Sequence, residues 1–150
     1  MTAFLPGDRT NSPPRRGEGR DGKPLVLVVE DHEDTCFLLT YYLGVCDCRV
    51  LVAEDGEEAV CMAEKARPDL ILMDISLPRL NGLKAAQRMR SLAVLQHVPI
   101  VFLSGHAEGS VRASALAHGG NDYLVKPFAL EELGRIVERY VSKSVWMKAE

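Results

Sequence analysis

The sequence predicts a doubly wound α/β fold, in which a parallel sheet lies between two layers of helices. Five short apolar runs alternate along the chain with five segments whose apolar residues recur every three or four positions. The central runs are apolar without a break, which is typical of parallel strands covered on both faces. With 150 residues, of which 47% are hydrophobic, the chain is long enough for one domain with a core and too short for two.

The five predicted strands are short apolar runs that end at polar or turn-forming residues. In the third strand, the apolar residues Leu70 to Met73 lead directly to Asp74, and Pro78 prevents the extended segment from continuing. The predicted strands span residues 24–29, 49–53, 70–74, 98–103 and 123–125.

The five predicted helices follow the strands. Acidic and capping groups at Glu33, Asp34 and Thr35 favour the start of the first helix, and Pro68 limits the second. The fourth segment, residues 108–118, offers little apolar area, so we expect it to be the loosest element of the core. On the solvent side of the third helix we expect Lys84, Arg88 and Arg90. Core-facing residues are expected to be Cys36, Leu39, Leu43 and Cys46 in the first helix, Ala59, Ala63 and Ala66 in the second, Leu83, Ala86, Met89 and Leu92 in the third, and Leu130, Leu133, Val137, Tyr140 and Val141 in the last.

Composition restricts the class of protein. Residues 1–23 are rich in proline, glycine and charged residues, which predicts a disordered, basic N-terminal tail. The net charge of −3 gives no strong basic field for nucleic acid or membrane surfaces. Neither a membrane span nor a signal peptide is evident, so we expect a cytoplasmic protein with no membrane partner.

The cysteines do not predict a metal site. Cys36, Cys46, Cys48 and Cys61 lie in or beside apolar helix faces, which suits reduced thiols that pack as small apolar groups. Cys46 and Cys48 could form half of a zinc site, but no second pair of cysteine or histidine residues stands at ligand spacing. The four histidines do not form a cluster by spacing either.

Polar side chains follow four of the predicted strands. Glu30 and Asp31 follow the first strand, Asp74 ends the third, Ser104 follows the fourth and Lys126 follows the last. The carboxyl ends of parallel strands lie along one edge of the sheet, and ligands bind there at the point where the strand order reverses. We therefore expect these five side chains to converge on one site.

The three acidic groups in this site require compensation. Two ionised carboxylates about 4 Å apart repel each other by about 4 kcal/mol at an effective dielectric constant of 20. An all-oxygen site with room for water and phosphate suits Mg²⁺ better than zinc. Mg²⁺, a lysine and a hydroxyl around one carboxylate are suited to phosphoryl transfer, in which Asp74 would be the nucleophile and Ser104 and Lys126 would contact phosphoryl oxygens.

In this order, the motifs resemble the receiver domain of bacterial two-component response regulators, the CheY-like proteins. The matching motifs are Glu30-Asp31, Leu72-Met73-Asp74, Leu77-Pro78 with Gly82, Ser104-Gly105 and Asp122-Tyr123-Leu124-Val125-Lys126-Pro127-Phe128. The resemblance covers residues 24–142 and leaves residues 143–150 as a short C-terminal tail. It implies a flavodoxin-like, five-stranded parallel sheet of order 2-1-3-4-5 with five helices.

The resemblance also implies the chemistry of the acidic site. Asp74 would accept a phosphoryl group from a phosphohistidine on a sensor histidine kinase or a histidine phosphotransfer protein. Glu30, Asp31, Asp74 and the backbone carbonyl of Ser76 would hold Mg²⁺, with Mn²⁺ as a substitute. Glu30 stands where aspartate is commoner, and it keeps the carboxylate.

Other matching positions carry the switch. Ser104 occupies the hydroxyl switch position, where threonine is commoner, and Tyr123 occupies the aromatic switch position. Lys126 would contact the phosphoryl group, and its peptide bond to Pro127 would be cis, the isomer that X-Pro bonds adopt at low cost. The positions that modulate phosphoryl lifetime in this family are Ser76 and His106.

The expected function is that of a stand-alone, single-domain response regulator. Only eight residues follow residue 142, so we expect no DNA-binding or other effector domain. Output would pass to an unknown downstream protein through the last two helices and the last strand, a surface that would also suit a homodimer. A phosphorelay intermediate, a phosphate sink and a phosphorylation-independent adaptor stay open as alternatives.

Two enzymatic interpretations are disfavoured, and we expect only autocatalytic phosphoryl transfer and self-dephosphorylation. A haloacid-dehalogenase-like phosphatase needs a second acid two residues after its nucleophile, and that position is Ser76. A dinucleotide-binding fold needs glycines after the first strand, where this chain has Glu30, Asp31 and His32.

Overall fold

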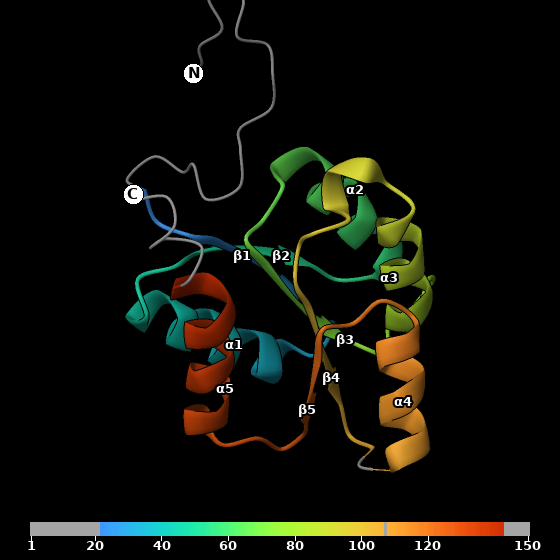
Figure 1. The fold of residues 1–150 in the computed structure, drawn as a ribbon. Helices are drawn as coiled ribbons and strands as arrows, with labels where there is room; N and C mark the ends of the chain where they lie inside the picture. The colour runs from blue at the N-terminus through green and yellow to red at the C-terminus, as the bar shows by residue number, and fades with distance from the viewer. Residues whose placement is uncertain (1–21, 107, 143–150) are drawn as a thin grey trace, which may run out of the picture.

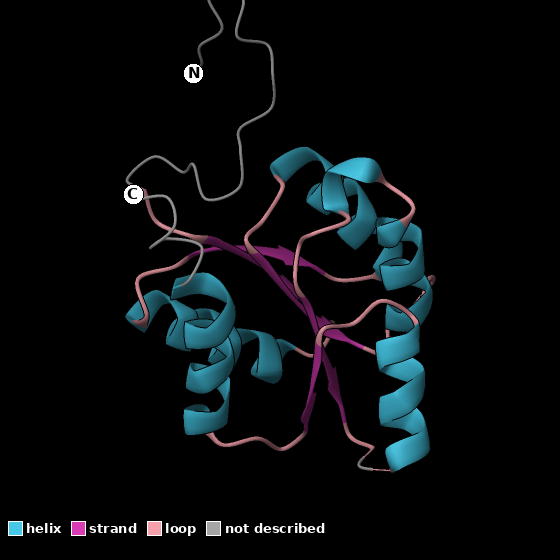
Figure 2. Ribbon diagram, viewed as in Figure 1, coloured by secondary structure: helices cyan, strands magenta, loops and turns pink. Residues whose placement is uncertain are grey.

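The computed structural model describes residues 22–106 and 108–142. The tails predicted at residues 1–23 and 143–150 therefore lie outside the described residues, apart from residues 22 and 23. Five parallel strands form one sheet in the order β2-β1-β3-β4-β5, which confirms the predicted fold (Figures 1 and 2). The strands are β1 (Leu25–Val29), β2 (Arg49–Ala53), β3 (Leu70–Asp74), β4 (Ile100–Ser104) and β5 (Asp122–Val125).

Helices cover both faces of the sheet. In Figure 1, α1 and α5 lie on one face, whereas α2, α3 and α4 lie on the other. Each face has its own apolar core, and all the residues of β1, β3 and β4 are buried between the two helical layers. The helices are α1 (Glu33–Val45), α2 (Gly56–Ala66), α3 (Gly82–Arg90), α4 (Gly109–Ala117) and α5 (Leu130–Val137), with a short 3₁₀ helix at Ala93–Leu95 and a π-helical turn at Glu138–Ser142.

The third helix differs from its prediction at its end. It stops at Arg90, so Leu92 lies beyond the helix rather than on its apolar face. Arg90 does not point freely into solvent. Its guanidinium donates to the carbonyl oxygens of Leu95 and Val98, both at 2.7 Å, and to that of Gly119 at 2.8 and 3.0 Å. Main-chain acceptors that the helix pattern does not reveal therefore draw this arginine against the protein.

The first helix buries a narrower stripe than its spacing predicts. Of the four residues expected to face the core, Leu39 and Leu43 are fully buried, while Cys36 and Cys46 are half-buried. Cys36 lies in the first turn of α1 and Cys46 directly follows its last residue, and both are partly buried where they pack against the core on this face. In α4, Ala115 is the one buried residue among those described, which agrees with its small apolar area; its looseness stays a prediction.

Candidate functional site

Asp74 ends β3 at the carboxyl edge of the sheet. The side chain is buried, and its Oδ1 atom accepts a hydrogen bond from the backbone N–H of Ser76 at 3.3 Å. The first residue of α3, Gly82, packs directly against this strand end, and its N–H donates to the carbonyl oxygen of Ile75 at 2.9 Å. A Cβ atom on Gly82 would overlap the main-chain oxygen of Asp74, so the close approach of α3 requires glycine.

Glu30 reaches the same edge from the end of β1. Its backbone N–H donates to the carbonyl oxygen of Ala53 at 3.0 Å, and its side chain is fully buried. Burial by itself raises the pKa of the Glu30 carboxyl, but hydrogen bonds from Lys126 and His32 outweigh it and hold the pKa below its ordinary value. Glu30 is therefore a buried carboxylate that is kept ionised by its partners.

Lys126 carries positive charge into this site from the end of β5. Its Nζ atom lies 2.9 Å from Oε1 of Glu30 and 3.5 Å from Oδ2 of Asp74. Burial and then the Glu30 charge raise the pKa of Asp74 above its ordinary value, and Lys126 only partly offsets them. The Lys126–Pro127 peptide bond is cis.

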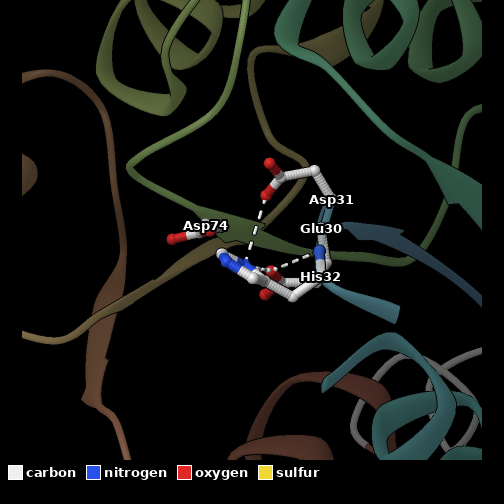
Figure 3. Close-up of side chains that lie close together, drawn as sticks. All are labelled: Glu30, Asp31, His32 and Asp74. Carbon is white, nitrogen blue, oxygen red and sulfur yellow. Dashed lines mark hydrogen bonds and ion pairs between the residues drawn. The ribbon is translucent and has the colours of Figure 1, made fainter. Parts of the chain in front are cut away.

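Four side chains at this edge of the sheet bring metal-ligating atoms close together. These atoms, one each from Glu30, Asp31, His32 and Asp74, all lie within 4.8 Å of one another among the described residues (Figure 3). Three of them are the predicted carboxylates, which the fold thus brings together. Carboxylate oxygens with partly open access are the donor set that Mg²⁺ takes in proteins, so the residues present fit this ion.

His32 was not predicted as part of the site. Its Nδ1 atom lies 3.0 Å from Oε2 of Glu30 and 3.4 Å from Oδ1 of Asp31. The hydrogen bond to Glu30 and the two nearby carboxylates raise the pKa of His32. Spacing among the four histidines could not reveal this role, whereas its position directly after Glu30 and Asp31 could have done so.

Ser104, His106 and Tyr123 form a second group beside the acidic site. Ser104 is buried at the end of β4, and its Oγ atom accepts the backbone N–H of His106 at 3.1 Å. The hydroxyl of Tyr123 donates to the carbonyl oxygen of His106 at 2.6 Å, and the Tyr123 ring is already buried, with 5% of the residue exposed. The guanidinium of Arg112 lies 5.8 Å from the centre of that ring.

A shallow cavity adjoins the acidic residues on the β2 side. Its volume is about 160 Å³, and it is lined by Glu30, Asp31, His32, Glu33, Cys36, Val52 and Glu54. This space is sufficient for several water molecules beside the carboxylates. The acidic edge is therefore accessible to small ligands from solvent.

The sequence matches a known protein family and individual relatives. A family model for the response regulator receiver domain matches residues 26–138. The chain is 35% identical over 119 residues to the alkaline phosphatase synthesis transcriptional regulatory protein PhoP of Bacillus subtilis. That alignment covers 79% of this chain and 49% of PhoP, so the chain spans about half the length of this relative.

Solved structures with the same fold include two receiver domains in informative states. One is the receiver domain of the sensor histidine kinase PA1611 from Pseudomonas aeruginosa PAO1, with a magnesium ion coordinated in its active-site cleft; the TM-score is 0.75 at 38% identity, over 80% of this chain and 98% of that one. The other is the co-crystal structure of the Saccharomyces cerevisiae histidine phosphotransfer protein Ypd1 with the receiver domain of Ssk1; the TM-score is 0.77 at 29% identity, over 82% and 92% of the two chains.

The described helices do not have the character of membrane spans. Within residues 22–106 and 108–142, none has both the length and the apolar composition needed to cross a bilayer.

Proposed function

The chain belongs to the response regulator receiver domain family, and we propose that residues 24–142 accept a phosphoryl group on Asp74 in a Mg²⁺-dependent reaction. The observation that carries the proposal is the position of Asp74, whose carboxylate is buried beside two other acids and 3.5 Å from Lys126. Transfer of the phosphoryl group onto Asp74 and its later loss by hydrolysis would be the only reactions. The domain would then act as a signalling switch and not as an enzyme with a separate substrate.

The transfer step follows from the chemistry of a carboxylate nucleophile. An oxygen of Asp74 attacks the phosphorus of a phosphohistidine, a P–O bond forms, and the P–N bond breaks. The imidazole of the donor leaves with the electron pair and takes up a proton from solvent. When bound, Mg²⁺ supplies positive charge that stabilises the phosphoryl oxygens, and Glu30, Asp31, Asp74 and the Ser76 carbonyl would hold it.

Lys126 and Ser104 would stabilise the phosphorylated form. The ammonium group of Lys126 already lies between Glu30 and Asp74, so a phosphoryl group on Asp74 can take one of its hydrogen bonds. The Ser104 hydroxyl accepts the His106 N–H in this structure and keeps its own proton available for a phosphoryl oxygen. Ser76 and His106, which flank the site, are proposed to set the lifetime of the phosphoryl group.

Output would pass through Tyr123 and the elements that surround it. We propose that the inward position of Tyr123 is the one that phosphorylation favours, because its bond to the His106 carbonyl links β5 to the loop that follows Ser104. The surface of α4, β5 and α5 would then bind a downstream protein. Helix α4 supports this role because it buries little of its surface, and an element with few buried contacts can change position at low free-energy cost.

The phosphoryl donor is proposed to be a sensor histidine kinase or a histidine phosphotransfer protein. The fold match with the Ssk1 receiver domain bound to Ypd1 supports this class of partner. A phosphorylation-independent adaptor is the alternative of another class, and it predicts that Asp74→Asn leaves signalling in cells intact.

The test is incubation of the protein with acetyl phosphate and Mg²⁺, followed by intact mass spectrometry. We expect an alkali-labile phosphoryl adduct that requires Mg²⁺ and is abolished in Asp74→Asn. The matched control is Asp34→Asn, which removes an exposed acid in the first turn of α1 and should retain the adduct. An adduct that persists in Asp74→Asn, or none in the wild type, would contradict the proposal.

A further inference from the structure

His32 adds a nitrogen donor to a site that otherwise offers oxygen. Its backbone is fixed at the start of α1, where its carbonyl oxygen accepts the N–H of Cys36 at 2.9 Å. Its side chain is 69% exposed, so the ring can rotate at little packing cost. The ring already lies against the carboxylates of Glu30 and Asp31, so its Nδ1 atom is within reach of an ion that these acids hold.

The separation of these atoms suits a single ion. Zinc binds histidine nitrogen and carboxylate oxygen at about 2.0 to 2.2 Å and holds four ligands as a tetrahedron, so any two ligand atoms are about 3.4 Å apart. Nδ1 of His32 already lies 3.0 Å from Oε2 of Glu30 and 3.4 Å from Oδ1 of Asp31. All four donor atoms lie within 4.8 Å of one another, so the remaining separations must close by at most about 1.4 Å. Four protein ligands are also the number that zinc takes in closed sites.

Ligand chemistry distinguishes the two ions at this site. Mg²⁺ prefers oxygen and keeps several water molecules, so it gains little from an imidazole. Zn²⁺ binds imidazole well and stands above Mg²⁺ in affinity for mixed nitrogen and oxygen sites. A zinc ion closed in by three carboxylates and His32 would have no open position for a phosphoryl oxygen, so it could not stabilise transfer to Asp74.

We propose that His32 is a metal ligand that allows Zn²⁺ to bind at the acidic site in place of Mg²⁺, and that bound Zn²⁺ blocks phosphorylation of Asp74. The inhibitory half of this inference rests on the proposed function. The site is then a point at which the level of free zinc regulates the response.

The direct test follows the histidine ring nitrogens by long-range ¹H–¹⁵N NMR while the full chain is titrated with Zn²⁺ or with Mg²⁺. We expect Zn²⁺ to shift a ring nitrogen of His32 strongly, whereas Mg²⁺ leaves it almost unchanged. His118, whose ring contacts the carbonyl oxygen of Ser114 on α4, is the internal control and should not respond. Zinc bound to cysteines elsewhere would not produce the His32 shift. Unshifted His32 nitrogens at saturating Zn²⁺ would overturn the inference.

The second test measures how buffered free Zn²⁺ inhibits the labelling of the protein by acetyl phosphate at a fixed Mg²⁺ concentration. The labelling of each variant is expressed relative to its own level without zinc. We expect His32→Gln to need about tenfold more Zn²⁺ for half inhibition, the scale on which losing a group at a metal site acts. His118→Gln should match the wild type. Equal zinc sensitivity in His32→Gln and the wild type would overturn the inference. The NMR titration needs no variant, so the inference stays testable even if His32→Gln folds poorly.

The outcomes separate this inference from the proposed function. If Asp74 is phosphorylated with Mg²⁺ but His32 does not respond to Zn²⁺, only the zinc inference fails. If His32 responds to Zn²⁺ but Asp74 accepts no phosphoryl group, the metal ligand stands, while the proposed function and the inhibitory half of the inference fail.

Discussion

The ammonium group of Lys126 lies 2.9 Å from the carboxylate of Glu30, although 96 positions separate the two residues in the sequence. The Glu30 side chain is fully buried and that of Lys126 is 22% exposed. A buried carboxylate of this kind depends on its cation, because removal of one partner leaves an uncompensated charge.

Replacement of this lysine by an apolar residue should therefore destabilise the protein. For Lys126→Met we expect the free energy of unfolding at neutral pH to fall by about 2 to 3 kcal/mol, somewhat less than for a fully buried pair, because His32 still contacts Glu30. The pKa of Glu30 lies below its ordinary value, so its stabilising effect exists above the pKa of the unfolded chain and is lost as pH falls through the folded pKa.

The difference between wild type and variant should accordingly shrink below about pH 4. Urea denaturation at neutral and acidic pH measures both effects. Lys84→Met, on the exposed side of α3, is the matched control and should change stability by less than about 0.5 kcal/mol. A loss in Lys126→Met that is independent of pH would contradict this account.

The ionised carboxylate of Asp74 should lower the free energy of unfolding when no metal is bound. Its pKa lies above the ordinary value because of burial and then the Glu30 charge, so the folded state holds its proton more tightly than the unfolded chain. Stability therefore falls as pH rises through the interval between the unfolded and folded pKa values. The carboxylate oxygens of Glu30 and Asp74 lie within 4.8 Å of each other, and two unit charges at that distance repel by roughly 3 kcal/mol at an effective dielectric constant of 20. Lys126 offsets part of this repulsion.

We expect Asp74→Asn to raise the free energy of unfolding by about 1 kcal/mol at neutral pH in the presence of EDTA. Added Mg²⁺ should stabilise the wild type by mass action and the variant much less, because the variant loses one ligand. Thermal or urea denaturation with and without Mg²⁺ measures both changes. The prediction is wrong if the variant is the less stable protein in EDTA.

The two glycines Gly82 and Gly44 should respond to alanine in opposite directions. A Cβ on Gly82 would overlap the main chain of Asp74, whereas one on Gly44 in α1 has nothing within 4 Å. We expect Gly82→Ala to lower stability by about 2 kcal/mol or more and to displace Asp74. Gly44→Ala should raise stability by about 0.5 kcal/mol through helix propensity. Urea denaturation tests the pair, and equal effects would refute the packing argument.

Tyr123 should lose a measurable interaction when its hydroxyl is removed. Tyr123→Phe keeps the buried ring and deletes the bond to the carbonyl oxygen of His106, so we expect a loss of about 1 kcal/mol in stability. Amide NMR shifts should move at His106 and Ser104. Tyr41→Phe, at an exposed position on α1, is the control and should leave the free energy of unfolding unchanged.

Addition of beryllofluoride and Mg²⁺ should change the NMR shifts of amides between residues 104 and 128 in the wild type. Unchanged shifts would contradict the proposed switch.

Much of the fold and the site follows from local patterns. Unbroken apolar runs predicted the buried strands β1, β3 and β4, and all three are confirmed with small differences at their ends. Parallel strands end at one edge of the sheet, so the residues that follow them had to meet there. This rule alone was enough to bring Glu30, Asp31 and Asp74 together with Lys126.

Other features needed the tertiary structure. Arg90 was predicted on the solvent side of its helix, but carbonyl oxygens from residues five to 29 positions away draw it inward. Phe37 and Tyr41, which the predicted apolar face of the first helix leaves out, are 72% and 65% exposed, and their rings stack on each other, a contact that was not predicted. The contacts of His32 were not predicted either.

The sequence by itself determined which elements form, in what order, and which side chains stand at the carboxyl edge. Only the tertiary structure decided how these side chains pair: that Lys126 bonds Glu30 more closely than Asp74, that His32 joins the acids, and that Tyr123 is turned inward. The reason is physical. Periodicity and turn chemistry act over a few neighbouring residues, whereas the choice of a partner depends on distances, burial and charge between segments that meet only when the chain is folded.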